Sequence, residues 1–229
     1  MKKLLTTANL HFIIVSVVLF THSACLTPKK ADSYIAEQYG NQLPKLNKKK
    51  IENIDVKSTS NSNNNLISTT IKKTDKFLPL IVYWKFDHRI KSSLNPAIAI
   101  TNFTNNLNSA ASKELIQKLN GRKLELTVEQ VPVTFSLVYK ENVIWVIYAF
   151  SWTKIFVEPE LTDLVVSYKL TESGDVIKTG TITIKNTDSN KGLRLFQTWK
   201  SAFSEYIIQY NTNNRIMTSL FVKQLLAEI

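Results

Sequence analysis

From residue 78 onward, the pattern of apolar and polar positions predicts a folded domain that mixes strands and helices. Residues 80–86 form a nearly continuous apolar run rich in β-branched and aromatic side chains, which is typical of a central strand. Apolar residues then recur every four positions across residues 103–119, which indicates one face of a helix. The Asn120–Gly121 pair is a C-cap signal that would end this helix.

Later segments show the alternation or the short apolar runs that are typical of strands. They are residues 124–128, 133–139, 143–150, 164–170 and 176–184. The polar triplet at 140–142 separates two of these strands and predicts the turn of a hairpin. Residues 171–175, which include Gly174, predict the turn of a second hairpin because glycine accepts a positive φ.

The last part of the chain predicts a second amphipathic helix, because apolar residues from Phe196 to Leu225 follow a helical spacing. The tetrad NTNN at residues 211–214 consists of poor helix formers and predicts a kink or a break. The order strand, helix, several strands, helix predicts an α+β fold. We expect a curved antiparallel sheet of about five or six strands with two helices on one face.

The first 24 residues have the layout of a secretory signal peptide. Lys2 and Lys3 precede an uncharged apolar stretch at residues 12–20, and small residues then lead to Cys25. The stretch is shorter than the ~20 apolar residues that a membrane-spanning helix needs. We therefore expect residues 1–24 to be a cleavable signal peptide.

Ser23-Ala24-Cys25 resembles the end of the lipobox of bacterial lipoproteins, with His22 where leucine is customary. The resemblance implies that a diacylglyceryl group is attached to Cys25 and that the chain is cleaved before it. Two or more acyl chains anchor a protein stably in a membrane. Cys25 is the only cysteine, so no disulfide can form within one chain. Two alternatives stay open: a soluble secreted protein with an incidental thiol, and a buried cytosolic helix at residues 10–20.

Residues 25–77 are predicted to be a lipidated and largely flexible tether for a domain at 78–229. The segment 57–65 has almost no apolar side chain with which to offset its ordering entropy. The alternative is that parts of residues 31–56 pack on the domain. Cys25 is not followed directly by an aspartate, and by family analogy this implies the outer membrane, with the domain facing the periplasm.

The domain plan is similar to that of small envelope lipoproteins of the transport-auxiliary and lipopolysaccharide-assembly kind. The matching features are residues 165–170, the Gly174–Asp175 turn, Thr179–Gly180 and the long C-terminal amphipathic helix. The resemblance covers roughly residues 80–229 and is architectural. It carries no functional residue over to this chain, and a shared fold does not establish a shared function.

Charge and motifs exclude several functions. The net charge is +11, but the densest basic run, Lys48–Lys50, lies outside the predicted domain, so no nucleic-acid partner is expected. One histidine beyond the signal peptide and one lipid-committed cysteine leave no ligand set for zinc, and no metal site is expected. Phosphate-binding loops and a G-x-S-x-G nucleophile elbow are absent, so neither a cofactor nor catalysis is expected.

Two fragments resemble parts of an acid–base site. They are Asp87-His88-Arg89 and the pair Glu158 and Glu160. We expect both to lie in solvated loops. A hydrolase is a third hypothesis, and it would require acids that converge around His88.

Aromatic residues supply the remaining candidate. Trp84 and Trp145 lie in apolar runs and are expected in the core, whereas Trp152 has mixed neighbours and is the candidate contact for a ligand or partner. The first hypothesis is a non-catalytic envelope lipoprotein that docks a protein partner through a sheet edge or the C-terminal helix. The alternative is a lipoprotein that binds lipid or glycan in a groove between helix and sheet.

Overall fold

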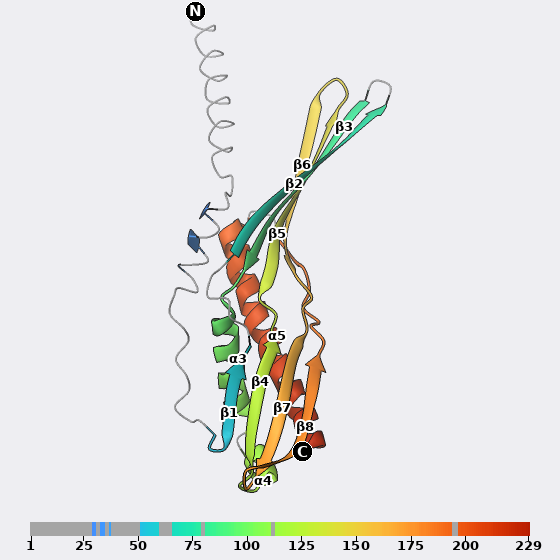
Figure 1. Cartoon of the computed structure of the whole chain (residues 1–229). Coiled ribbons are helices and arrows are strands. Elements are labelled where there is room, and N and C mark those ends of the chain that lie inside the picture. Colours follow the sequence, from blue (N-terminus) through green and yellow to red (C-terminus); the bar gives the residue numbers. More distant parts are fainter. Residues whose placement is uncertain are drawn as a thin grey trace, which may run out of the picture.

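Two twisted β-sheets follow one another along a single long helix (Figure 1). This arrangement comes from a computed structural model. The residues that the structure describes are 29–30, 33–34, 37, 51–59, 66–78, 81–110, 113–193 and 197–229. The predicted α+β class is confirmed. The predicted signal peptide and Cys25 lie outside the described residues.

The first sheet has four strands in the order β1-β4-β7-β8. Their bounds are β1 Ile54–Ser58, β4 Lys123–Gln130, β7 Leu164–Glu172 and β8 Asp175–Ile184. Strand β1 runs parallel to β4, and the other pairs are antiparallel. The turn between β7 and β8 is the predicted one: Ser173 has φ 52° and Gly174 has φ 100°, as a tight turn with left-handed residues requires.

The second sheet has five antiparallel strands in the order β2-β3-β5-β6-β9. Their bounds are β2 Leu66–Leu78, β3 Ile81–Ser93, β5 Thr134–Trp145, β6 Ala149–Pro159 and β9 Lys191–Gly192. The prediction of one sheet with five or six strands is therefore wrong. The chain changes sheets after β1, β3, β4, β6 and β8. The alternation of apolar residues does not show whether a strand extends one sheet or starts another.

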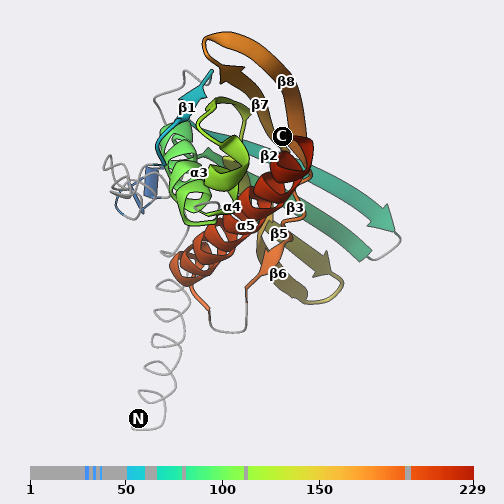
Figure 2. The ribbon, with the colours of Figure 1, turned by 90° about the horizontal axis from the view of Figure 1, so that it is seen from below.

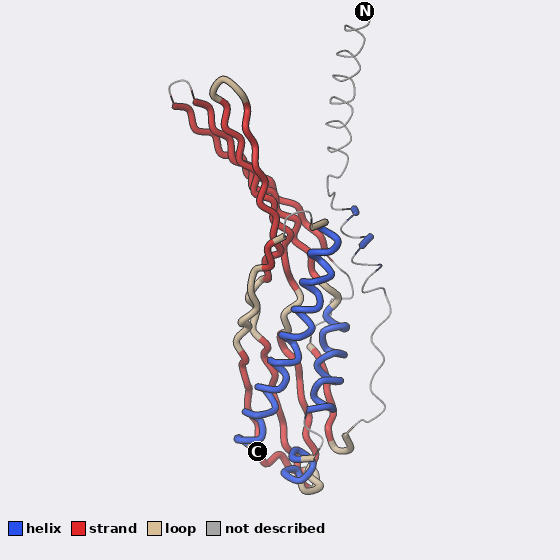
Figure 3. The backbone as a smooth tube through the Cα atoms, turned by 180° about the vertical axis from the view of Figure 1, so that it is seen from behind, coloured by secondary structure: helices blue, strands red, loops and turns tan. Residues whose placement is uncertain are grey.

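The helices are α3 Pro96–Ala110, α4 Glu114–Leu119 and α5 Trp199–Glu228. The one helix predicted over residues 103–119 is divided between α3 and α4, and the predicted C-cap ends α4: Asn120 has φ 45° and Gly121 has φ 84°. The Thr198 side chain accepts a hydrogen bond from the Ser201 amide and caps the start of α5. Helices α3 and α5 lie side by side on one face of the four-stranded sheet (Figures 2 and 3).

Helix α5 links two hydrophobic cores. Its 30 residues span about 45 Å at ~1.5 Å per residue. Phe203 and Tyr206, near its start, pack with Phe135 of the five-stranded sheet. Phe221 and Leu225, near its end, pack in the core of the four-stranded sheet. The start of α5 therefore packs on the five-stranded sheet, and its end packs on the four-stranded sheet.

The middle of α5 pins the segments that pass between the sheets. The Tyr210 hydroxyl donates to the carbonyl oxygen of Pro132 over 2.6 Å. The side-chain amide of Asn213 donates to the side-chain oxygen of Asn186 over 2.8 Å. The backbone N–H of Asn186 in turn donates to the Asp163 carboxylate over 3.0 Å. The predicted break at residues 211–214 is absent: α5 continues through them, and the Asn213 side chain binds a crossing segment.

Part of the segment predicted as a tether belongs to the fold. Strand β1 pairs with β4, and β2 pairs along its length with β3. Ile51 and Ile54 are buried in the core of the four-stranded sheet, and Val56 packs against it. The alternative that residues before 57 pack on the domain is confirmed for this part, so the folded region begins well before residue 78.

Candidate functional site

Four strands of the five-stranded sheet extend beyond the core as a narrow twisted arm (Figures 1 and 3). Ile90, Leu137 and Val157 lie opposite one another on β3, β5 and β6, and they form the last row before the tip in which all three side chains are buried. We call residues 72–78, 81–87 and 140–154 the arm. Nine residues separate Ile90 from Ile81, so the arm projects about 30 Å at ~3.3 Å per residue.

The arm has no core of its own. Each of its side chains with a described exposure is exposed or half-buried, on both faces of the sheet. The strands are held by their backbone pairing and by local contacts. The Tyr83 hydroxyl donates to the Asn142 side chain over 2.6 Å, and the Lys140 ammonium lies 5.0 Å from the centre of the Phe156 ring. A sheet with both faces in water does not stabilise the fold by burial.

Apolar side chains gather at the free end of the arm. We call this group the tip: Phe77, Ile81, Trp145, Val146, Ile147, Tyr148 and Phe150. Ile147 is 80% exposed, Phe77 is 75% exposed and Tyr148 is 74% exposed. The tip joins two hairpin ends, because Val82 of the β2–β3 hairpin pairs with Trp145 of the β5–β6 hairpin. An exposed apolar cluster of this kind marks a contact surface.

The turn at the tip was predicted in the wrong place. Strand β5 runs through the polar triplet 140–142, and the chain turns at residues 146–148 instead. Trp145, predicted in the core, is 47% exposed, and Trp152 is 43% exposed on the arm, as expected for a contact residue. Polar residues in the strand and apolar residues in the turn invert the usual pattern, and such inversions are expected at functional sites.

Charge divides the two faces of the arm. Directly paired residues share a face, and faces alternate along each strand. One face, which we call the basic face, carries five of the six arm lysines and a single acid, Asp87. These lysines are Lys72, Lys76, Lys85, Lys140 and Lys154. Among the residues whose side chains are described, the opposite face carries Lys73 and Glu141. The basic face therefore has a formal charge of +4, whereas the charges of these two residues on the opposite face cancel.

Aromatic side chains lie among the lysines of the basic face. Tyr83 pairs with Ile144, which pairs with Phe150, and the next row on this face places Lys85 opposite Asn142 and Trp152. The basic face thus combines cations with aromatic rings directly behind the tip. Sequence reasoning found Trp152 but missed this arrangement, because it appears only when the register of four strands is known.

His88 does not converge with the acids of the two acid–base fragments. Asp87, His88 and Arg89 lie within strand β3, not in the predicted loop, so His88 faces away from its two neighbours. The His88 ring lies 6.0 Å from the Tyr139 ring, and its Nε2 atom has no hydrogen-bond partner among the described residues. A histidine base needs an orienting partner, and no described carboxylate orients this one.

The carboxylates on the opposite face of β3 are neutralised by cations. Arg89 donates to Glu158 over 2.7 Å and lies 3.6 Å from Asp87. Lys91 and Glu160 form an ion pair at 2.7 Å. Glu158 and Glu160 therefore lie at the base of the arm as ion-pair partners. In the part of the chain that the structure describes, no group of three or more His, Cys, Asp and Glu side chains is placed to hold a metal ion.

A basic cavity lies where the N-terminal residues meet α5. It measures about 490 Å³ and is lined by Lys29, Lys30, Ser33, Tyr34, Glu37, Trp199 and Lys200. The Tyr34 hydroxyl donates to the Lys200 carbonyl over 3.0 Å, and the Tyr34 and Trp199 rings meet edge to face at 5.3 Å. The Lys200 ammonium lies 5.8 Å from both ring centres. Tyr34 is thereby held beside the start of α5.

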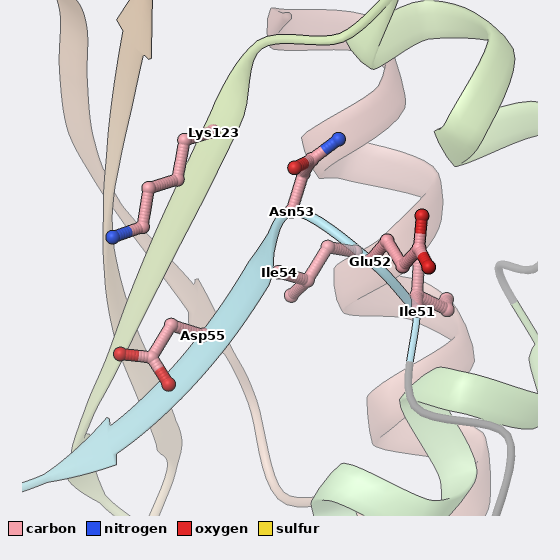
Figure 4. Close-up of a pocket in the computed structure, with 6 residues that line it drawn as sticks. All are labelled: Ile51, Glu52, Asn53, Ile54, Asp55 and Lys123. Carbon is pink, nitrogen blue, oxygen red and sulfur yellow. The ribbon is translucent and has the colours of Figure 1, made fainter. Parts of the chain in front are cut away.

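A larger hollow lies at the far end of the four-stranded sheet, away from the arm (Figures 1 and 4). Its volume is about 630 Å³, and its lining includes Glu52, Asp55 and Lys123. Figure 4 shows the Asp55 carboxylate and the Lys123 ammonium on the same side of β1, with Glu52 directed away from them. The three charged groups do not converge on one point, so the hollow is a weaker candidate than the arm.

Comparison with known protein families, with curated proteins and with solved structures finds no match to this chain. Among the helices that the structure describes, none combines the length and apolar character needed to cross a membrane.

Proposed function

We propose that the protein is a membrane-tethered, non-catalytic docking protein of the bacterial cell envelope, and that the arm is its contact element. The tether is lipid on Cys25, as the lipobox resemblance implies, with the protein at the outer membrane and facing the periplasm. The observation that carries the proposal is the tip, a cluster of large apolar side chains at the end of a projection that adds nothing to the core.

The position of the basic cavity supports the tether. Lys29 follows Cys25 by four residues, which reach about 15 Å at most when fully extended at ~3.6 Å each. Lys29 lines the same cavity as Trp199 at the start of α5, and the arm leaves the body at this same end (Figure 1). Lipid on Cys25 would hold this end of the body next to the membrane, with the arm attached to the same end.

The composition of the tip supports docking. Trp, Tyr and Phe are enriched among the residues that dominate binding energy at interfaces. Trp145, Tyr148 and Phe150 lie within six residues of one another around a single turn. The alternative, a ligand groove between helix and sheet, has less support because Phe203, Tyr206 and Phe135 pack closely where α5 covers the five-stranded sheet.

The tether is tested by labelling cells with radioactive palmitate. We expect the wild-type protein to incorporate label and to fractionate with membranes, and we expect Cys25→Ala to lose both properties. Equal labelling of the two proteins would remove the lipoprotein proposal.

The docking role of the arm is tested by photocrosslinking in intact cells. A photoreactive amino acid at Ile147 is expected to form adducts with the component that the tip contacts. The matched control is Ile208, an exposed isoleucine of α5 whose side chain is 66% exposed. Adducts at Ile147 that do not form at Ile208 would support the proposal. Absence of any adduct with protein or lipid at Ile147 would contradict it.

A further inference from the structure

We propose that the arm contacts an anionic lipid bilayer: the tip inserts into the bilayer interface, and the lysines of the basic face lie behind it at the level of the headgroups. This inference rests on the proposed function, because it names the surface that the arm docks on. It commits to a membrane as the partner, and a protein partner becomes an outcome of the test below.

The side chains of the tip suit the boundary between headgroups and acyl chains. Trp145 and Tyr148 have rings with one polar group, which favour the membrane–water interface. Val146 and Ile147 lie between them at the turn and offer purely aliphatic surface. Phe77 and Ile81 add to this surface from the neighbouring hairpin. Hydrocarbon chains would cover these side chains, whereas a nucleic acid or a glycan offers no comparable apolar phase.

The lysines of the basic face stand where headgroups would lie. Lys76 pairs with Tyr83 just behind the tip, and Lys85 lies two residues further along β3 on the same face. Three residues separate Lys85 from Val82, which is about 10 Å at ~3.3 Å per residue. Such a distance matches the depth at which apolar side chains sit below the headgroups, ~5–10 Å. Among the described ion pairs, none engages Lys76, Lys85 or Lys154, so these charges are not neutralised within the described part of the fold.

The tether and the arm share one end of the body, which brings a bilayer within reach of the tip. The basic cavity lies beside the start of α5, and β3 and β6 leave the body near the same place (Figures 1 and 3). The anchor on Cys25 would hold the bilayer within about 15 Å of Lys29, and the arm is about 30 Å long. An arm of that length can meet the surface that holds the tether, and Lys29, Lys30 and Lys200 would face the same headgroups.

The test reads the fluorescence of Trp145 in vesicles. The full-length protein is reconstituted into vesicles of phosphatidylcholine alone or mixed with phosphatidylglycerol, with bromine on the acyl chains as a short-range quencher. In the vesicles that contain phosphatidylglycerol, we expect bromine to quench part of the tryptophan fluorescence of the wild-type protein. This quenched part should be missing in the Trp145→Phe variant. Trp145→Phe keeps an apolar ring at the position, and circular dichroism checks that it folds.

Variants of charge and apolarity sharpen the test. Ile147→Glu is expected to lower the ratio of inserted to free tip at least about tenfold. Lys76→Gln is expected to lower it about fivefold, the effect of one cation near an anionic surface. The controls are Ile208→Glu and Lys223→Gln, which change exposed residues of α5 and should leave quenching unchanged.

The results distinguish three possibilities: the tip contacts a membrane, it contacts a protein, or it contacts neither. Equal quenching in pure phosphatidylcholine would overturn the role of the basic face. A lack of Trp145-dependent quenching, together with a lack of lipid adducts from a photoreactive Ile147 in the same vesicles, would overturn lipid insertion. If Ile147 then crosslinked a protein in cells, docking would stand with a protein partner. If it crosslinked neither protein nor lipid, docking itself would fall.

Discussion

The four-stranded sheet and the arm are built from similar strands but use their apolar residues in opposite ways. In β4, Leu124, Leu126 and Val128 alternate with polar residues and are buried beneath the helices. In the arm, apolar and charged side chains lie on both faces, and none with a described exposure is buried. Apolar side chains stabilise a fold only when they leave water. The comparison therefore separates residues that hold the protein together from residues that are available to another surface.

The largest expected difference between the two regions comes from replacing one phenylalanine in each of them with alanine. Phe203 is fully buried against Phe135, whereas Phe150 is 62% exposed at the tip. We expect Phe203→Ala to lower the free energy of unfolding by about 3–5 kcal/mol. Phe150→Ala should change it by no more than about 0.5 kcal/mol. Urea unfolding followed by circular dichroism measures both, and equal losses would contradict the separation.

A second effect concerns the joint between the two sheets. The pKa of Tyr210 is raised from 10.0 to about 12, mainly by burial; the Asn214 side chain opposes this shift, and the nearby Asp188 carboxylate adds to it. The folded state holds this proton after the unfolded state has lost it, so the stability that the neutral hydroxyl provides is present below pH 10 and is lost as pH rises toward 12. We expect a decline of about 1.4 kcal/mol per pH unit in that window.

The variant Tyr210→Phe isolates this contribution. It should be less stable at neutral pH by about 1–3 kcal/mol, because the carbonyl oxygen of Pro132 loses its buried donor. Between pH 10 and 12 its stability should fall less steeply than that of the wild type. Urea unfolding at several pH values compares the slopes, and parallel curves would show that Tyr210 does not titrate with unfolding.

Those features that the sequence predicted correctly depend on local signals. The C-cap at Asn120 and the turn at Gly174 follow from residues that tolerate a positive φ, and both are confirmed. The alternation in residues 124–128 predicted a half-buried strand, which is also confirmed. Such signals need only neighbouring residues, so a single sequence is sufficient to identify them.

The features that the sequence missed depend on distant partners. Residues 211–214 predicted a break in the last helix, yet Asn213 is used to bind Asn186, which lies 27 residues away in the chain. Residues 140–142 predicted a turn because consecutive polar and charged residues are typical of turns. In the arm both faces of the sheet are in contact with solvent, so these residues can lie within a strand. The basic face was invisible for the same reason, since it joins lysines from four strands.

A smaller expected effect compares two glycines. A Cβ atom on Gly180 would lie 2.7 Å from the Tyr168 ring, which packs in the core of the four-stranded sheet. Gly192, in β9 of the other sheet, has open space around the same position. We expect Gly180→Ala to cost about 1–3 kcal/mol because the ring must shift. Gly192→Ala should stay within about 0.5 kcal/mol. Thermal unfolding compares the two variants, and equal shifts in melting temperature would argue against the close contact of Gly180 with Tyr168.

The smallest expected effect on stability is also the most informative about the arm. Ile147 is 80% exposed in a turn, so Ile147→Ser removes apolar surface that folding does not bury. The free energy of unfolding should therefore change by less than about 0.5 kcal/mol. The same substitution should raise solubility in detergent-free buffer and weaken contact with whatever the tip binds, since both depend on apolar area in water. Urea unfolding measures the stability of Ile147→Ser, and sedimentation measures its solubility. Ile208→Ser is the matched control in both measurements. A large loss of stability at Ile147 would mean that the tip packs within the fold, and the arm would then be part of the body.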